Sequence, residues 1–364
     1  MLALLLEVLP RVLLATTGLI LRRPVKEQIL GDNDASWRLF WEALHKRHAE
    51  WTGQFAIYDA IRGWALKPNV RNLAPFQKDK VLNSNSKGIR GITEYDDVRP
   101  PGTHRILVLG DSFSFGTEVS DDETYSHYLE TELMDTQVLN LGVQGYGHDQ
   151  MLLYLEQAGL RYHPDIVLLG FVYPDIYRNL WTFFAFAKPK FTLIPNGLKL
   201  TNVPVPTPEE ILAREPYHSK ALDVATIVQD RFLWVAGVNE RRAQVLSRAI
   251  LDELIAKVRS IGAVPVFLYM PVYDEVQDSS TAMNAHEAFL QDYCQSRGIG
   301  CVFMRQHFRS AAAHGVKLEA RFHWTPAMHR MAADDLANYL KQHGIVATAQ
   351  AERLTASGGP ATRH

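Results

Sequence analysis

The sequence of 364 residues lacks several features that would place it in a specialised class of proteins. Only two cysteines are present, and their spacing matches no zinc-binding pattern. We expect Cys294 and Cys301 to be two buried thiols, and two cysteines do not decide the redox compartment. Positive charge is not in excess either, because 38 Lys and Arg are balanced by 40 Asp and Glu. This balance argues against nucleic acid as a partner.

A long uninterrupted apolar run at the start of the chain is also missing. Residues 2–21 are mostly apolar, but Glu7, Pro10 and Arg11 interrupt them, and one charge in mid-span costs about 2.5–3.5 kcal/mol on insertion. The segment also lacks the basic start and cleavage site of a signal peptide. We expect a helix that packs on the protein or contacts a membrane surface. A true anchor is the alternative, so the localisation stays open between cytoplasmic, membrane-associated and periplasmic.

What the chain does contain is a regular alternation of strand-like and helix-like segments between residues 101 and 346. Hydrophobic residues make up 47% of the chain, which is enough for a sizeable core. Repeated strand–helix units predict an α/β fold with a parallel sheet. The predicted strands are 105–109, 138–141, 166–172, 264–269 and 301–304, and the predicted helices are 122–134, 149–162, 240–261, 282–297 and 326–343.

Three segments fall outside this alternation. Residues 1–100 are expected to form a helical extension that packs on the domain or leads into it. Residues from about 180 to 235 interrupt the alternation as an insertion, with a hairpin around Asn196-Gly197. This insertion is expected either to cover a site as a lid or to be a surface elaboration. The tail 347–364 is rich in Ala, Thr, Gly and Ser and is expected to be disordered.

Candidate functional residues follow the predicted strands. The strand 105–109 ends at Gly110-Asp111-Ser112, and loops at the carboxyl ends of such strands hold the ligands of α/β sheets. Ser112 is therefore a candidate nucleophile, which needs a base and an oxyanion hole. The glycine-rich loop 140–147 follows the next strand and suits close backbone approach. His323 lies just before the last predicted helix and is the candidate base.

This combination resembles the SGNH/GDSL hydrolase family, in particular a bacterial branch with a run like residues 85–91 ahead of Gly-Asp-Ser. Further matches are Gly116, Thr124-Tyr125, Val138-Leu139-Asn140, Gly145-Tyr146-Gly147 and Pro164-Asp165. The resemblance implies a flavodoxin-like three-layer α/β/α sandwich with a five-stranded parallel sheet, and no metal or organic cofactor. It implies Ser112 as the nucleophile, Gly145 as an oxyanion donor and His323 as the base. The G-x-S-x-G elbow of α/β-hydrolases is not found around Ser112.

Two positions depart from the family pattern. The family's third block has an asparagine that donates into the oxyanion hole, and here that position is Pro174, which has no donor. Asp175 keeps the next position, and Asn179, one helical turn further, is a candidate substitute. Losing one such donor typically costs about 2.7–4 kcal/mol in the barrier.

The second departure concerns the acid of the triad. The family places it three or two residues before the histidine, where this chain has Ala320 and Arg321. Glu319 is the nearest carboxylate and a candidate to orient His323. Otherwise a Ser–His dyad works with a backbone carbonyl, or the site is impaired. We expect Asp111 to shape the nucleophile loop rather than to act as a base.

The resulting prediction is a serine-dependent ester hydrolase acting on a small-molecule or carbohydrate ester. Two alternatives stay open. One is an O-acyltransferase in envelope polysaccharide modification, which uses the same residues. The other is a non-catalytic binding protein on the same fold, which both departures favour.

Overall fold

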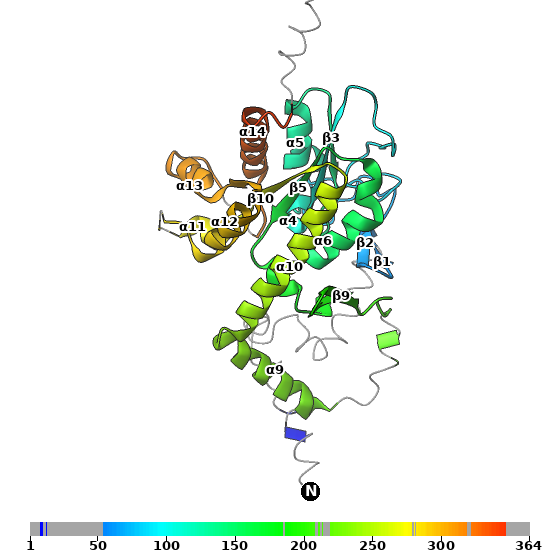
Figure 1. Cartoon of the computed structure of the whole chain (residues 1–364), viewed down its shortest axis with the longest axis vertical. Coiled ribbons are helices and arrows are strands. Elements are labelled where there is room, and N and C mark those ends of the chain that lie inside the picture. Colours follow the sequence, from blue (N-terminus) through cyan, green and yellow to red (C-terminus); the bar gives the residue numbers. More distant parts are fainter. Residues whose placement is uncertain are drawn as a thin grey trace, which may run out of the picture. The chain divides into compact units, whose positions relative to one another are not determined.

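The computed structural model describes residues 8–9, 12, 54–184, 186–207, 210–211, 213, 219–278, 280, 282–318 and 322–346. The chain forms two compact units (Figure 1). The first unit comprises residues 1–67, 147–153 and 174–252, and the second comprises residues 68–146, 154–173 and 253–364. Helices α6 (His148–Tyr154) and α10 (Val238–Ser260) each contribute to both.

The second unit contains a five-stranded parallel sheet, as predicted. Its strands in spatial order are β11 (Gly300–Phe303), β10 (Val264–Tyr269), β5 (Ile166–Phe171), β3 (His104–Leu109) and β4 (Thr136–Asn140). All five predicted strands are confirmed to within two residues. From β3 the chain leaves to β4 on one side, and from β5 it leaves to β10 on the other. The β3–β5 pair is therefore the topological switch point, where α/β sheets bind their ligands.

Helices cover both faces of this sheet. On one face, α5 (Tyr125–Glu132) and α14 (Pro326–Gln342) share a buried apolar cluster with β3, β5 and β10. On the other face, Tyr293 of α12 (Ala285–Arg297) stacks on Phe267 of β10. The remaining helices of this unit are α4 (Ser112–Phe115), α11 (Tyr273–Gln277) and α13 (Arg305–Ala313). The predicted three-layer α/β/α class is thus confirmed.

Two predicted helices are more irregular than expected. The segment 122–134 divides into a 3-10 turn, η1 (Asp121–Glu123), and α5, because Thr124 is extended and its hydroxyl accepts the His127 N–H. The segment 149–162 begins as α6 and continues as a π turn, η2 (Leu155–Gly159), and a 3-10 turn, η3 (Leu160–Tyr162). Neither deviation changes the order of the strands in the sheet.

The first unit consists of short hairpins and helices. Its elements are β1 (Ala56–Asp59), β2 (Gly63–Leu66), α7 (Asp175–Arg178), β6 (Phe183–Phe184), β7 (Phe186–Ala187), β8 (Lys190–Ile194), β9 (Gly197–Thr201) and α9 (Lys220–Val235). The hairpin around Asn196-Gly197 is confirmed as β8–β9. The predicted insertion, about residues 180–235, falls within this unit. Its role as a lid stays a prediction, as do the boundaries proposed for the domains.

The expectation of a helical extension is wrong for residues 56–66. There β1 and β2 form an antiparallel hairpin. The carboxylate of Asp59 accepts the N–H groups of Ile61 and Arg62 at 2.9 and 2.8 Å, and this side-chain turn reverses the chain. Most of residues 1–53, including the segment 2–21 apart from Val8, Leu9 and Val12, lies outside the described residues, as does the tail 347–364.

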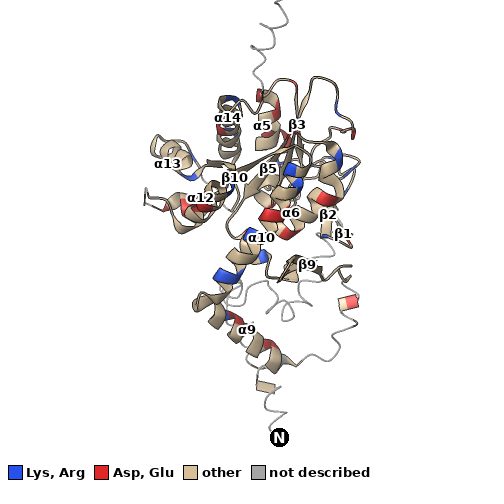
Figure 2. Ribbon diagram, viewed as in Figure 1, with Lys and Arg blue, Asp and Glu red and all other residues tan. Residues whose placement is uncertain are grey.

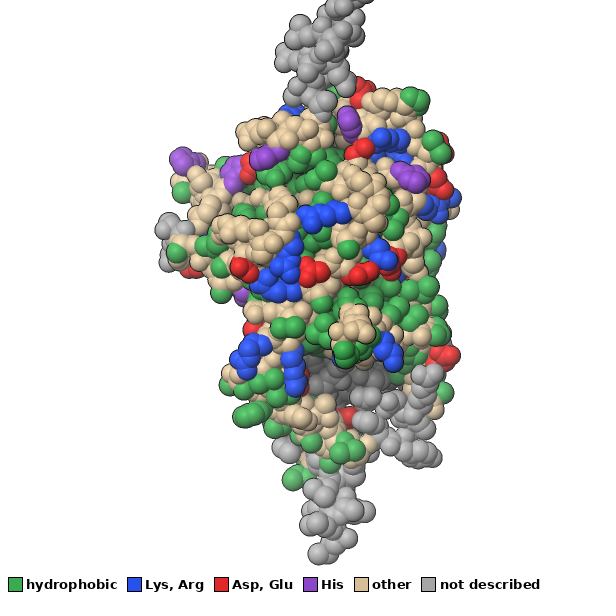
Figure 3. All heavy atoms as spheres, in the orientation of Figure 1, with side chains coloured by type: hydrophobic (Ala, Val, Ile, Leu, Met, Phe, Trp, Pro, Cys, Tyr) green, Lys and Arg blue, Asp and Glu red, His purple; other side chains and the backbone are tan. Residues whose placement is uncertain are grey.

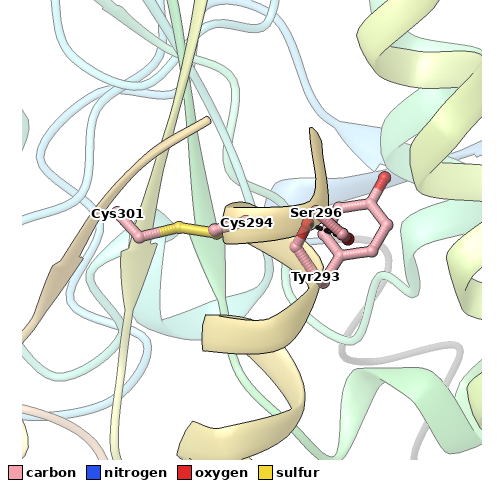
Figure 4. Close-up of a disulfide and its surroundings, with 4 residues drawn as sticks. All are labelled: Tyr293, Cys294, Ser296 and Cys301. Atoms are coloured by element: carbon pink, nitrogen blue, oxygen red, sulfur yellow. Dashed lines mark hydrogen bonds between the residues drawn. A yellow bond between two sulfur atoms is a disulfide. The ribbon is translucent and has the colours of Figure 1, made fainter. Parts of the chain in front are cut away.

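The prediction of two free buried thiols is also wrong. Cys294 of α12 and Cys301 of β11 form a disulfide (Figure 4). Gly298 ends α12 in the left-handed conformation, with φ of 61°, and turns the chain directly into β11. The two Cα atoms consequently lie 6.5 Å apart, within the usual range for a disulfide.

Charged side chains of both signs share the surface of the described residues. Figure 2 shows Lys and Arg interspersed with Asp and Glu over the helices of the second unit, and the face drawn in Figure 3 shows the same mixture. Within the described ranges, no helix is both long enough and apolar enough to cross a bilayer. Membrane contact through residues 2–21 stays a prediction.

Candidate active site

Ser112 is the first residue of α4, at the carboxyl end of β3. Asp111 caps this helix, because its Oδ1 accepts the Phe113 N–H at 2.9 Å, and its side chain is fully buried. A Cβ atom on Gly110 would lie 2.2 Å from Ser114 Oγ, so the turn into the helix requires glycine here. Asp111 therefore shapes the loop, and the Ser112 N–H belongs to the first turn of α4, where N–H groups have no intrahelical partner.

His323 reaches Ser112 from the far end of the chain. Its Nε2 lies 2.9 Å from Ser112 Oγ, and its ring packs on Phe113 with centroids 5.2 Å apart. The next residue, Trp324, is buried and donates its indole N–H to the Pro271 carbonyl at 3.1 Å. Thr325 then caps α14. The backbone on the C-terminal side of His323 is thus held by an anchored indole and a helix cap.

The loop after β4 approaches the same helix. Asn140 donates its amide to the Ser114 carbonyl and to Ser126 Oγ, both at 2.9 Å, and accepts the Gly142 N–H at 2.9 Å. A Cβ atom on Gly142 would lie 2.4 Å from the Phe115 nitrogen. Gly145 follows with φ of 76°, and among the described residues its N–H has no acceptor.

Arg90 is a structural part of the site that sequence reasoning did not identify. Its buried guanidinium donates to the carbonyls of Phe115, Gly116 and Val119 at 2.6–2.7 Å, and its Nε donates to Asp121 at 2.9 Å. Burial lowers the pKa of Arg90, and the charge of Asp121 opposes this shift. The only signal was its position in the run 85–91. Arg90 fixes the carboxyl end of the helix whose first residue is Ser112.

His329, to which the sequence assigned no role, lies behind the nucleophile helix. Its Nδ1 accepts the Tyr125 N–H at 3.2 Å, and the Tyr125 hydroxyl donates to Ser114 Oγ at 3.0 Å. Burial, together with the charges of Arg90 and His323, lowers the pKa of His329 to about 3. The ring is therefore neutral near pH 7, and because Nδ1 is an acceptor, the proton resides on Nε2.

Asp175 and Asn179 belong to the first unit, where their side chains form an ion pair and hydrogen bonds. Asp175 is buried and forms an ion pair with Arg178 in the same helix. Asn179 donates its amide to Ser247 Oγ at 2.7 Å and to His148 Nδ1 at 3.2 Å, and its Oδ1 accepts the Asp149 N–H. This network gives no support to Asn179 as an oxyanion donor.

Two further expectations from the sequence concern the carboxylate that orients His323 and the presence of a metal ion. Glu319 lies outside the described residues, so the identity of the group that orients His323 stays a prediction. In the described part of the chain, no group of three or more His, Cys, Asp or Glu side chains is placed to hold a metal ion.

Comparison with solved structures gives distant likenesses. TesA is 14% identical, with a TM-score of 0.41 over 66% of this chain and 99% of that chain. The acetyl xylan esterase AlAXEase is 12% identical, with a TM-score of 0.41 over 65% and 100%. A catalytic mutant of Axe2, an acetylxylan esterase from Geobacillus stearothermophilus, is 12% identical, with a TM-score of 0.40 over 67% and 96%. These likenesses are too weak to assign a function.

Comparison with protein families is decisive. No sequence among curated proteins matches the chain. The model of the GDSL-like lipase/acylhydrolase family matches residues 108–331. The match spans more than half of the chain and includes both Ser112 and His323. The protein therefore belongs to the GDSL-like lipase/acylhydrolase family, a family of ester-hydrolysing enzymes.

Proposed function

We propose that the protein is a serine-dependent ester hydrolase with Ser112 as the nucleophile and His323 as its base. The observation that carries this proposal is the 2.9 Å separation between His323 Nε2 and Ser112 Oγ. This is the contact through which a base removes the proton from a serine hydroxyl. The proposed substrate is a small-molecule or carbohydrate ester.

In the first half of the reaction, Ser112 Oγ attacks the ester carbonyl carbon while His323 takes its proton. The carbonyl oxygen becomes an oxyanion, and the N–H groups of Ser112 and Gly145 donate to it. The intermediate then expels the alcohol, which receives the proton from His323. In the second half, water attacks the acyl-serine with His323 as base, the acid leaves, and Ser112 is regenerated.

The proposed site differs from the family pattern at two positions, the oxyanion asparagine and the acid of the triad. Pro174 supplies no side-chain donor, so the proposed oxyanion hole consists of backbone N–H groups, and a missing donor typically costs about 2.7–4 kcal/mol in the barrier. His323 is oriented either by Glu319 or by a backbone carbonyl. We therefore expect a slow hydrolase rather than an inactive one.

The alternatives use the same residues differently. In an O-acyltransferase, a second alcohol replaces water in the second half of the reaction. A non-catalytic binding protein would have no need of a histidine within hydrogen-bonding distance of the serine. The Ser112–His323 contact therefore favours catalysis.

The proposal is tested by labelling the full chain with a fluorophosphonate probe, which reacts with activated serines. We expect labelling of the wild type and its loss in Ser112→Ala and His323→Ala. Ser114→Ala is the matched control, because this serine lies in the same helix but is bound to Tyr125, and this variant keeps its labelling. A folded wild type that does not react, or undiminished labelling of Ser112→Ala, would refute the proposal.

A further inference from the structure

A carboxylate–histidine pair that the proposed mechanism does not use lies in the second unit. Glu275 of α11 and His286 of α12 meet with Oε1 and Nδ1 2.8 Å apart. The side chain of Glu275 is 9% exposed, whereas that of His286 is 39% exposed. The pair thus combines a buried carboxylate with a ring that a ligand can reach.

Glu275 is held in one orientation by several donors. It accepts the Tyr269 hydroxyl at 2.7 Å, the Val272 N–H at 3.0 Å and the Asn284 amide at 3.2 Å. Burial alone would raise the pKa of Glu275, but the hydrogen bonds from His286, Tyr269 and Val272 and the charge of His286 together lower that pKa. A carboxylate only accepts hydrogen bonds, so Nδ1 of His286 carries a proton. Nε2 has no hydrogen-bond partner among the described residues and can accept one from a ligand.

The Glu275–His286 pair and the Ser112–His323 pair both lie at the carboxyl edge of the sheet. His286 stacks on Tyr173 with ring centroids 3.8 Å apart. Leu109 of β3 pairs with Leu169 of β5, and Ser112 and Tyr173 follow these paired residues by three and four positions. Neighbouring strands are about 4.8 Å apart, so the segments after β3 and β5 begin close to each other at this edge.

A second set of contacts links the same two places through the loop after β10. Trp324, which follows His323, binds the Pro271 carbonyl. Val272, the next residue of that loop, donates its N–H to Glu275. The segments that carry His323 and Glu275 are therefore linked through Pro271 and Val272, at the same edge of the sheet.

We propose that His286, oriented by Glu275, binds a free hydroxyl group on the alcohol portion of the substrate, which is therefore the ester of a polyol. The inference rests on the proposed function and extends it to a substrate class. An imidazole nitrogen with a fixed partner on its other side binds a hydroxyl group well, whereas a saturated acyl chain offers nothing to it. Glu275 is a positioning residue, and the proton transfers stay with His323.

The test compares two esters with the same acyl group and the same three-carbon alcohol skeleton. 1-Acetylglycerol has two free hydroxyl groups, and n-propyl acetate has none. We expect the wild type to prefer 1-acetylglycerol in kcat/KM. In His286→Phe, which keeps an aromatic ring on Tyr173, kcat/KM for 1-acetylglycerol should fall roughly tenfold, while that for n-propyl acetate changes less than twofold. Glu275→Gln should reduce the preference in the same direction.

The outcomes separate this inference from the proposed function. A parallel loss on both esters in His286→Phe would show a structural role and overturn the inference, as would a wild type without preference. Fluorophosphonate labelling without turnover of 1-acetylglycerol would also overturn it and leave the nucleophile assignment intact. Absence of both labelling and turnover would refute the proposed function itself.

Discussion

His323 Nε2 lies 2.9 Å from Ser112 Oγ, although 211 positions separate the two residues. Each residue stands next to a capped helix start at the same edge of the sheet. Asp111 caps α4, and Thr325 caps α14. Short-range hydrogen bonds therefore fix the backbone on both sides of the contact, and the parallel sheet brings the two helix starts together.

The first prediction concerns this contact. His323→Gln removes the base, so we expect kcat/KM for 4-nitrophenyl acetate to fall on the order of a thousandfold. The control is His314→Gln, since His314 is exposed at the end of α13, and it should stay within twofold of the wild type. Circular dichroism checks that both variants are folded. A loss below tenfold in a folded His323→Gln protein would contradict the assignment of the base.

The positions of Ser112 and His323 at the carboxyl edge of the sheet were predictable, because each residue lies beside the start of a helix that the sequence pattern marks, whereas the roles of Ser112, His323 and Gly145 stay predictions. The position of Arg90 was not predictable, because charged residues are mostly exposed. Its burial depends on carbonyl groups of Phe115, Gly116 and Val119 that converge only in the folded chain. Hydrogen bonds between distant parts of the chain produce no periodic pattern in the sequence, so the burial of Arg90 could not be predicted from it.

The second prediction follows from the contacts of Arg90. Arg90→Met removes its hydrogen bonds to three carbonyls and leaves Asp121 without its cation, so the free energy of unfolding should fall by about 2–4 kcal/mol. Arg161→Met is the matched control, because Arg161 and Asp97 form an exposed pair worth less than about 1 kcal/mol. Urea denaturation measures both. Equal losses in the two variants would show that Arg90 does not hold the helix.

The strands of the sheet were predictable because buried parallel strands are continuous apolar runs. The hairpin β1–β2 was missed because a side-chain turn at Asp59, not the residue pattern, creates it. The disulfide was missed for a related reason. Two cysteines seven positions apart are compatible with free thiols or with a bond until the turn at Gly298 is known.

The third prediction concerns that disulfide. Replacing both Cys294 and Cys301 by serine removes the link across a short loop, and the free energy of unfolding should fall by about 2–3 kcal/mol on the chain-entropy estimate. Urea denaturation with and without dithiothreitol measures the effect. The reductant should destabilise the wild type and leave the double variant unchanged. Two thiols titrating in the denatured, unreduced wild type would instead show that the bond is absent.

The fourth prediction is a pH dependence caused by His329. Its pKa falls from the ordinary 6.5 to about 3 in the folded protein, chiefly through burial. Below pH 6.5 the unfolded chain takes up a proton that the folded protein does not, so stability decreases as the pH falls towards 3. The slope for one such group is about 1.4 kcal/mol per pH unit, and above pH 6.5 the effect vanishes. His148 in the first unit, with its pKa also lowered to about 3, adds a slope of the same sign.

Replacing His329 by asparagine isolates its share of that slope. The asparagine Oδ1 offers an acceptor for the Tyr125 N–H in place of Nδ1, but it does not titrate between pH 3 and 7. Between pH 6.5 and 4, we expect the free energy of unfolding of His329→Asn to vary less steeply with pH than that of the wild type, by up to about 1.4 kcal/mol per pH unit. Above pH 7 the two proteins should show the same pH dependence. His314→Asn, at an exposed position, should keep the slope of the wild type. If His329→Asn kept it as well, the histidine would have to be protonated in the folded protein, and the acceptor role of its Nδ1 would be wrong.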